Sequence, residues 1–307
     1  MDQEIRNRIM ATFLGRSILF IKREVARITA VVTTLAYYTR TNLDHSGGTL
    51  EINDKSHQDT RDRGLFSLFK EVVDIISSNG QKDINVVYHE TLYNENKTDN
   101  MWTYYFHPID NSTKEKFILF FTKRPYKDLL SSETINNLRL FNKIISTRIK
   151  IKEDIVAKAN LFLEKNLKNK KFMAVHYRGT DVQKTISGYP GIFKKASIQS
   201  YFSEIDHALD RGYDSIFVAT DEENILNLFL EKYGGRVIFY PSKKSINGQA
   251  IHKSENDRRQ NGEDVIVEVL VMSMASFLLY GCSNVPTVVK YLNPQIPSKN
   301  LDLIKNS

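Results

Sequence analysis

The C-terminal half of the chain alternates short apolar segments with segments of helical periodicity. The predicted strands lie at 171–177, 215–220, 236–240 and 276–281, and the predicted helices at 197–212, 221–235, 262–275 and from 284 on. Ser197 is the predicted N-cap of the first of these helices and Gly212 its predicted C-cap. This alternation is typical of βαβ units, so we expect an α/β fold with a parallel sheet and ligands bound beyond the carboxyl ends of its strands.

The N-terminal half has a mixed pattern. Its regular segments are predicted helices at 65–78 and 131–167, the second long enough to hold two helices, and predicted strands at 84–90 and 117–121. The polar segment 42–63 is predicted to be a loop. A chain of 307 residues has room for about two domains, which we place at 1–160 and 161–307.

An apolar seam runs from Ala11 to Leu35 in steps of three and four residues. The seam predicts a long amphipathic helix at the N-terminus, docked on the body of the protein. Two alternatives stay open. The helix could pair with its copy in a homodimer, or it could lie on a membrane surface, because Arg16, Arg23 and Arg27 lie off the seam.

The net charge indicates the kind of partner, and the cysteine content indicates the cellular compartment. A formal charge of +7 favours anionic partners, namely phosphates, nucleic acid or a membrane surface. The single cysteine, Cys282, excludes an internal disulfide and a cysteine-based zinc cluster, and favours a reducing compartment. The charged N-terminus lacks the apolar core of a signal peptide, and no apolar segment is long enough to span a membrane. We therefore expect a cytoplasmic protein, either free or peripheral at the membrane.

Polar side chains follow three of the predicted strands. These strand ends read His176–Asp181, then Thr220, Asp221 and Glu222, then Gly281–Asn284. In a parallel sheet all three ends lie on the same edge, which makes them a candidate ligand site. Taken singly, each piece also has a purely structural interpretation: His176 as a structural histidine, Arg178 in an ion pair with Asp181, and Asp221 with Glu222 as a helix cap.

The residue types at these ends suit a diphosphate. Arg178 can contact a phosphate through two hydrogen bonds, and Gly179 allows close approach of the backbone to a ligand. Ser283 and Asn284 begin a predicted helix, whose amides bind anions. Neither a Walker loop nor a GxGxxG motif occurs in the sequence.

Three ordered blocks resemble the GDP-fucose-dependent fucosyltransferase superfamily, which includes the nodulation and core α1,6-, the α1,2- and the protein O-fucosyltransferases. "HYRGTD" is similar to the HxRxxD motif of that superfamily. "IFVATDEENIL" is similar to its second block, and the segment from Glu263 to Pro294 to its third. The resemblance covers roughly residues 170 to 294, and residues 1 to 165 carry none.

The resemblance implies an inverting GT-B glycosyltransferase with two Rossmann-like domains, an acceptor-side domain at 1–160 and a nucleotide-sugar domain at 161–307. Arg178 would neutralise the diphosphate of the leaving GDP, and Glu268 would pair with guanine. The other donor-binding residues implied are His176, Gly179, Asp221, Ser283 and Asn284. Enzymes of this kind generally need no metal or other cofactor, so the expected partners are GDP-fucose or another GDP-sugar and a glycan acceptor.

The sequence departs from the superfamily at two points. Several relatives have a second arginine where this chain has Gly179, so a positive charge must come from elsewhere, with Lys184 or a basic residue of the 241–261 loop as candidates. The second departure concerns the general base. The position after Asp181 is charged in some relatives, and here it is Val182. Asp181 is the first candidate for the base, with an N-terminal acidic residue or His89 as the alternative.

Two other functions remain open from the sequence. One is transfer from another GDP-linked sugar, and the other is non-catalytic binding of a nucleotide or nucleic acid. No aromatic-basic RNA motif or helix-turn-helix pattern occurs, so nucleic acid is not an expected partner. The expected acceptors are glycans on a lipid carrier or soluble oligosaccharides.

Overall fold

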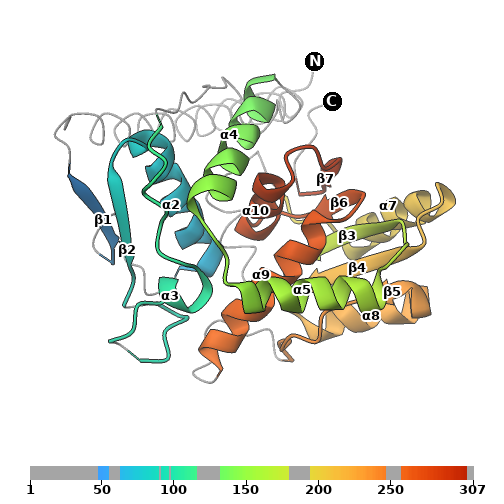
Figure 1. The fold of residues 1–307 in the computed structure, drawn as a ribbon. Coiled ribbons are helices and arrows are strands. Elements are labelled where there is room, and N and C mark those ends of the chain that lie inside the picture. Colours follow the sequence, from blue (N-terminus) through green and yellow to red (C-terminus); the bar gives the residue numbers. More distant parts are fainter. Residues whose placement is uncertain are drawn as a thin grey trace, which may run out of the picture.

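The protein is described from a computed structural model, which covers residues 48–54, 63–89, 91–96, 98–115, 132–179, 194–246 and 257–302. Four predicted features lie outside the described residues: the helix at Ala11–Leu35, the strand at 117–121, the group Asp181, Val182 and Lys184, and the centre of the 241–261 loop. The described chain is α/β, with one two-stranded and one five-stranded sheet (Figure 1).

The larger sheet confirms the parallel arrangement expected from the sequence. Its strands are β3 (Phe172–Tyr177), β4 (Ser215–Thr220), β5 (Val237–Ile238), β6 (Phe277–Tyr280) and β7 (Ser298–Asn300). They pair in the order β5-β4-β3-β6-β7, and every pair is parallel. The edge strand β7 was not predicted, because three polar residues carry no strand pattern.

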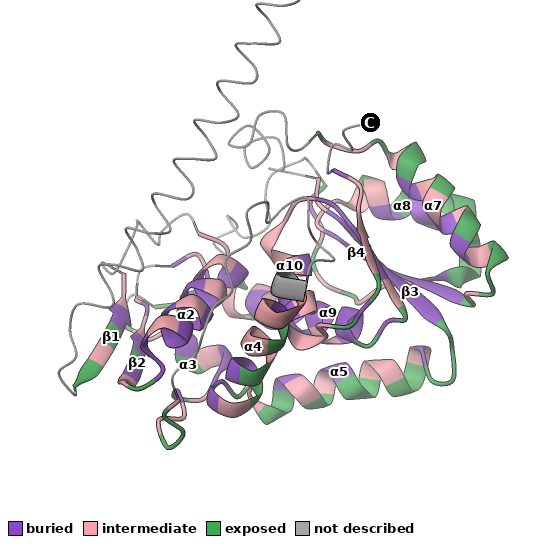
Figure 2. Cartoon of the chain, turned by 90° about the horizontal axis from the view of Figure 1, so that it is seen from above, coloured by how far each residue is buried: buried purple, intermediate pink, exposed green. Residues whose placement is uncertain are grey.

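Helices cover both faces of this sheet, which is why β3 and β4 are buried along their whole length (Figure 2). On one face α7 (Ile198–Asp210) and α8 (Glu223–Tyr233) pack against Met173, Val175 and their neighbours. The other face meets α5 (Glu153–Asn166) and α9 (Arg258–Ser273). Strands buried on both faces form continuous apolar runs, which made them easy to find in the sequence.

The helix boundaries follow the predictions closely, with two corrections. Ser197 caps α7 and accepts a hydrogen bond from the Ser200 amide, as predicted. The C-cap of α7 is Arg211, and Gly212 follows it with φ of 79°, the left-handed conformation that ends helices. Helix α9 begins at Arg258 rather than at the predicted residue 262. The sequence did not show this first turn because its residues are polar and have no apolar periodicity.

The smaller sheet lies in the N-terminal half. It pairs β1 (Thr49–Asn53) with β2 (Asp83–Val87) in parallel, and α2 (Leu65–Asn79), α3 (Trp102–Tyr105) and α4 (Ser132–Arg148) lie around it (Figure 1). The prediction of a loop over residues 42–63 is wrong for Thr49–Asn53, which form strand β1. Only Ile52 in this strand is fully buried, so the strand depends on its pairing with β2 rather than on an apolar run. The segment 131–167 holds two helices, α4 and α5.

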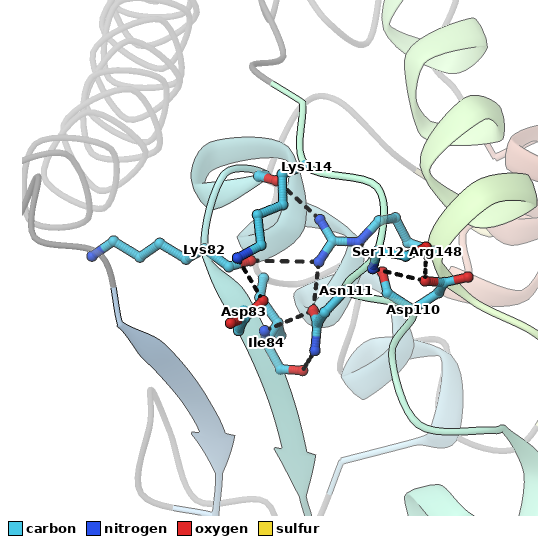
Figure 3. Close-up of polar contacts among 9 residues, drawn as sticks. Lys82, Asp83, Ile84, Asp110, Asn111, Ser112, Lys114 and Arg148 are labelled. Atoms are coloured by element: carbon cyan, nitrogen blue, oxygen red, sulfur yellow. Dashed lines mark hydrogen bonds and ion pairs between the residues drawn. The ribbon is translucent and has the colours of Figure 1, made fainter.

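A buried arginine ties the N-terminal half together (Figure 3). Arg148, at the end of α4, is 0% exposed and donates to the backbone oxygens of Asp110 at 2.6 Å and Gly80 at 3.1 Å, and to Asn111 Oδ1 at 2.8 Å. Asn111 in turn pairs with both backbone groups of Ile84 in β2. One guanidinium therefore joins α4, the turn after α2, β2 and the segment that follows α3.

Helix α10 (Asn284–Leu292) runs between the two halves and contacts α2, α4 and α9. The buried apolar residues accordingly form one cluster from Ile52 to the α9 face of the larger sheet, and a second cluster lies under α7 and α8. Among the described residues no helix combines the length and the apolar character needed to cross a membrane.

Candidate functional site

The strand order places a switch point between β3 and β6. From β3 the chain moves outward to β4 and β5, and then returns to β6 on the other side of β3. At such a point the two outgoing connections diverge and leave a crevice beyond the strand ends. Arg178 follows β3 and Ser283 follows β6, and the Arg178 Nη1 donates to Ser283 Oγ across the crevice at 3.3 Å. The two predicted motif residues therefore meet at this point.

A pocket of about 430 Å³ opens at this crevice. Its wall contains the predicted residues His176, Arg178, Asp221, Glu268, Ser283 and Asn284. The opposite wall comes from the N-terminal half, through the start of α2 and Tyr93. The prediction that the three strand ends share one edge is thus confirmed, and residues from segments far apart in the sequence complete the site.

The N-terminus of α10 is held in place on three sides. Ser283 is the N-cap, and its Oγ accepts from the Val285 amide at 3.3 Å. Asn284 Oδ1 accepts a hydrogen bond from Lys70 Nζ of α2 at 3.2 Å. Asp302, only 3% exposed, accepts from the Cys282 amide at 2.6 Å and fixes the turn before the helix. The sequence did not single out Asp302, which carries no motif.

His176 lines the pocket and is 7% exposed. Its Nδ1 has no hydrogen-bond partner among the described residues. Burial, with Arg178 nearby as a second cause, lowers the pKa of this imidazole to about 4. The ring is therefore neutral at neutral pH, and it offers a ligand a neutral polar contact rather than a positive charge.

This depressed pKa predicts an acid-dependent loss of stability. An unfolded histidine binds its proton near pH 6.5, whereas the folded protein resists protonation down to about pH 4. As the pH falls from 7 to 5, the unfolded state gains the proton first, and the free energy of unfolding drops by about 2 kcal/mol from this group. Urea unfolding at both pH values should show a drop that is about 2 kcal/mol larger in the wild type than in His176→Gln. An equal drop in the two proteins would contradict the assignment.

Asp221 and Gly179 form a close backbone contact. Asp221 Oδ1 accepts from the Gly179 amide at 2.9 Å, so this carboxylate shapes the turn after β3 as well as the pocket wall. A Cβ at position 179 would overlap the carboxylate of Glu222. Burial raises the pKa of that Glu222 carboxyl, with the charge of Asp221 as a smaller cause. A second arginine at this point would have to displace Glu222.

Glu268 reaches the pocket from α9, with 8% of its surface exposed. Its Oε1 already accepts hydrogen bonds from Ser242 Oγ at 2.7 Å and Lys244 Nζ at 2.9 Å. These partners hold the carboxylate in one orientation. The sequence placed Glu268 in the site through the family resemblance alone and missed Ser242 and Lys244, since a polar loop carries no spacing signal.

His89 is the described candidate for a general base. It follows β2, and its Nδ1 contacts the Asp99 carbonyl oxygen at 3.1 Å, while its amide donates to Asp54 Oδ2 at 2.9 Å. Because a carbonyl only accepts, Nδ1 carries the proton and Nε2 of the neutral ring is left to accept one. His89 is not among the residues that line the pocket.

Comparison with known proteins gives a match in structure alone. No protein-family model and no curated protein matches the sequence. The structure is similar to NodZ α-1,6-fucosyltransferase soaked with GDP-fucose, at 13% identity and a TM-score of 0.53, over 82% of this chain and 94% of that one. The fucosyltransferase NodZ from Bradyrhizobium gives 13% identity and a TM-score of 0.51, over 81% of this chain and 92% of the other. This chain therefore shares the overall fold of NodZ.

Proposed function

We propose that this protein is a glycosyltransferase that moves fucose from GDP-fucose to a hydroxyl group of a saccharide. The observation that carries the proposal is the meeting of Arg178, Ser283 and His176 in one pocket at the switch point of a NodZ-like fold. The solved NodZ structure was soaked with GDP-fucose, and His176 and Arg178 of the HxRxxD-like motif line the pocket here. The pocket volume of about 430 Å³ falls in the range of small-molecule sites.

In this proposal the site works by stabilising the leaving group. Arg178 and the amides at the start of α10 face the diphosphate, whose negative charge grows as the bond to the sugar breaks. The transfer inverts the anomeric centre, because a base activates the acceptor hydroxyl for direct attack. The candidates for that base are Asp181, His89 and an acidic residue of the N-terminal domain. No metal takes part in this scheme.

The proposal includes a GT-B arrangement of two Rossmann-like domains. Residues 1–160 would contact the acceptor, and residues 161–307 would bind the donor. Each of these parts has its own parallel sheet among the described residues, and α5 connects them. Tyr93 and the start of α2 would then contribute the acceptor side of the pocket.

Calorimetry with GDP, UDP and ADP tests the donor class, and a mass-spectrometric screen of nucleotide sugars with free sugars as acceptors tests the reaction. We expect GDP to bind more tightly than the other two nucleotides and fucose to be transferred. Equal binding of the three nucleotides would contradict the guanine-specific pocket. Transfer of a different sugar from its GDP conjugate would support the guanine-specific pocket and show that fucose is not the sugar transferred. Tight GDP binding without any transfer would indicate a non-catalytic nucleotide-binding protein.

Guanine recognition by Glu268 gives a sharper prediction. Both N1–H and the 2-amino group of guanine donate hydrogen bonds, so a fixed carboxylate suits this base. Glu268→Gln should weaken GDP binding by about 10- to 100-fold, since a charged hydrogen bond is lost. Binding of ADP should change little. Glu231→Gln, on the exposed face of α8, is the control. An unchanged GDP affinity in the pocket variant would remove Glu268 from the guanine site.

The acceptor and location complete the proposal. The acceptor would be an oligosaccharide, either soluble or on a lipid carrier, in the cytoplasm. The segment Ala11–Leu35 would pack on the body of the protein, with attachment to a membrane surface and pairing of two copies as the alternatives. Removing residues 1–35 and measuring vesicle co-sedimentation and the molecular mass in solution separates these two alternatives.

A further inference from the structure

We propose that Lys70 of α2 supplies the second positive charge at the diphosphate of the donor, opposite Arg178. This inference rests on the proposed function and names a residue from the N-terminal half of the chain. Several relatives have a second arginine at the position of Gly179, and Lys70 would replace the positive charge that is missing there. The residues suggested by the sequence for that role were Lys184 and the basic residues of the 241–261 loop.

The contacts of Lys70 place it at the same helix end as Arg178. Lys70 Nζ lies 3.2 Å from Asn284 Oδ1, and Arg178 Nη1 lies 3.3 Å from Ser283 Oγ. Ser283 and Asn284 are the N-cap and first residue of the nine-residue helix α10. Two cations from different halves of the chain thus contact consecutive residues at one helix N-terminus, and both line the pocket. Helix N-termini favour anions, and two flanking cations strengthen that preference.

A second observation in the pocket also indicates a polar ligand. His176 is 7% exposed and lines the same cavity, and its Nδ1 has no partner among the described residues. Buried polar atoms in folded proteins nearly always have a hydrogen-bond partner. A bound molecule with polar atoms would supply one here.

The two other lysines that line the pocket among the described residues are already paired with carboxylates. Lys244 bonds Glu268 at 2.9 Å, and Lys243 lies 3.8 Å from Asp257. Within the described part of the chain Lys70 forms no salt bridge, and its hydrogen bond is to a neutral amide. Burial raises the pKa of Asp74, one turn further along α2, to about 6, and the nearby charge of Lys70 opposes that rise without a salt bridge between the two side chains. Of the three lysines, Lys70 is therefore the one whose charge a diphosphate would meet.

The packing of α2 against α10 brings Lys70 to Asn284. The two helices touch, and Figure 1 shows them side by side. A diphosphate at the start of α10 would then be held by β3, α10 and α2 together. Donor binding would join the two halves of the protein through this contact.

Inorganic pyrophosphate is the direct probe, because it tests the charge without the guanine base or the sugar. We expect Lys70→Met to weaken both pyrophosphate and GDP binding by about 10- to 100-fold in calorimetry, and to reduce the salt dependence of binding. Lys70→Arg should restore most of the affinity. Guanosine, which has no phosphate, should bind equally to all of these proteins. Lys168→Met is the matched control, since that side chain is 59% exposed and its ion pair among the described residues is with Glu164, four residues earlier.

The outcomes separate this inference from the proposed function. Unchanged pyrophosphate and GDP affinities in Lys70→Met would overturn the role of Lys70, while a guanine preference in the wild type would still support the donor pocket. A loss of pyrophosphate binding without any preference for GDP over UDP would support Lys70 and overturn the guanine-specific donor. Equal losses in Lys70→Met and Lys168→Met would show a general charge effect and overturn the inference. Thermal unfolding of each variant is compared with the wild type. If Lys70→Met is destabilised, Lys70→Arg with wild-type stability must retain most of the pyrophosphate affinity, and a loss of that affinity in Lys70→Arg would overturn the inference.

Discussion

Replacing Arg178 by alanine is expected to lower transfer from GDP-fucose by at least about 100-fold, because charge on the leaving diphosphate would lose its nearest guanidinium. Arg178 reaches Ser283 across the crevice between β3 and β6, so it lies where the diphosphate would meet the start of α10. The largest loss should appear in kcat/KM. Single-turnover measurement of fucose transfer checks this, with GDP binding measured in parallel.

The controls for this variant come from the same sheet. Arg236→Ala removes an exposed arginine just before β5, at the opposite edge of the sheet, and should leave activity unchanged. Arg178→Lys keeps the charge but loses the two-point contact and should recover only part of the activity. Near-full activity in Arg178→Ala, with the fold intact by thermal unfolding, would contradict the role of this residue in the proposed mechanism.

The largest expected effect on stability comes from Arg148→Met. This guanidinium is 0% exposed and satisfies the backbone oxygens of Asp110 and Gly80 and the side chain of Asn111 (Figure 3). Methionine fills similar space but removes the Arg148 donor from the Asp110 oxygen, and it leaves the Gly80 oxygen and Asn111 Oδ1 with one donor each, the amides of Glu115 and Ile84. We expect the free energy of unfolding to fall by about 3 to 5 kcal/mol, as for other broken buried polar networks.

Urea unfolding measures this loss, with Arg139→Met as the matched control. Arg139 lies exposed on the same helix, so its replacement should change stability by less than about 0.5 kcal/mol. Asn111→Ala, which removes one member of the same network, should cost less than Arg148→Met. A loss below about 1 kcal/mol in Arg148→Met would show that water or rearranged side chains satisfy the freed carbonyls.

The sequence was most informative where burial is complete. Strands β3 and β4 are covered on both faces, so their apolar runs could be recognised without knowledge of their partners. Strands β1 and β7 are short and partly polar, and each exists through its pairing with one neighbour. A strand that depends on a distant partner leaves little local pattern to read.

The residues of the candidate site also fall into two groups, those that the sequence indicated and those that it did not. Arg178, Asp221 and Ser283 follow strands, and the parallel topology alone placed them on one edge. Lys70, Ser242 and Lys244 stand in a helix and a loop, where a lysine or serine has the same local appearance in solvent as in a pocket. The hydrogen bonds of Glu268 to Ser242 and Lys244 likewise join residues that no spacing rule connects.

The sequence by itself therefore determined the α/β class, the parallel sheet and the edge on which polar residues gather. These follow from local periodicity and from chain connectivity, which the order of residues contains directly. The tertiary structure decided which further groups face that edge: Lys70 across from Arg178, Glu222 beside Gly179, and Lys244 on Glu268. The physical reason is that the environment of a charged side chain depends on how its helix packs, and α2 meets α10 only through contacts between residues more than 200 positions apart.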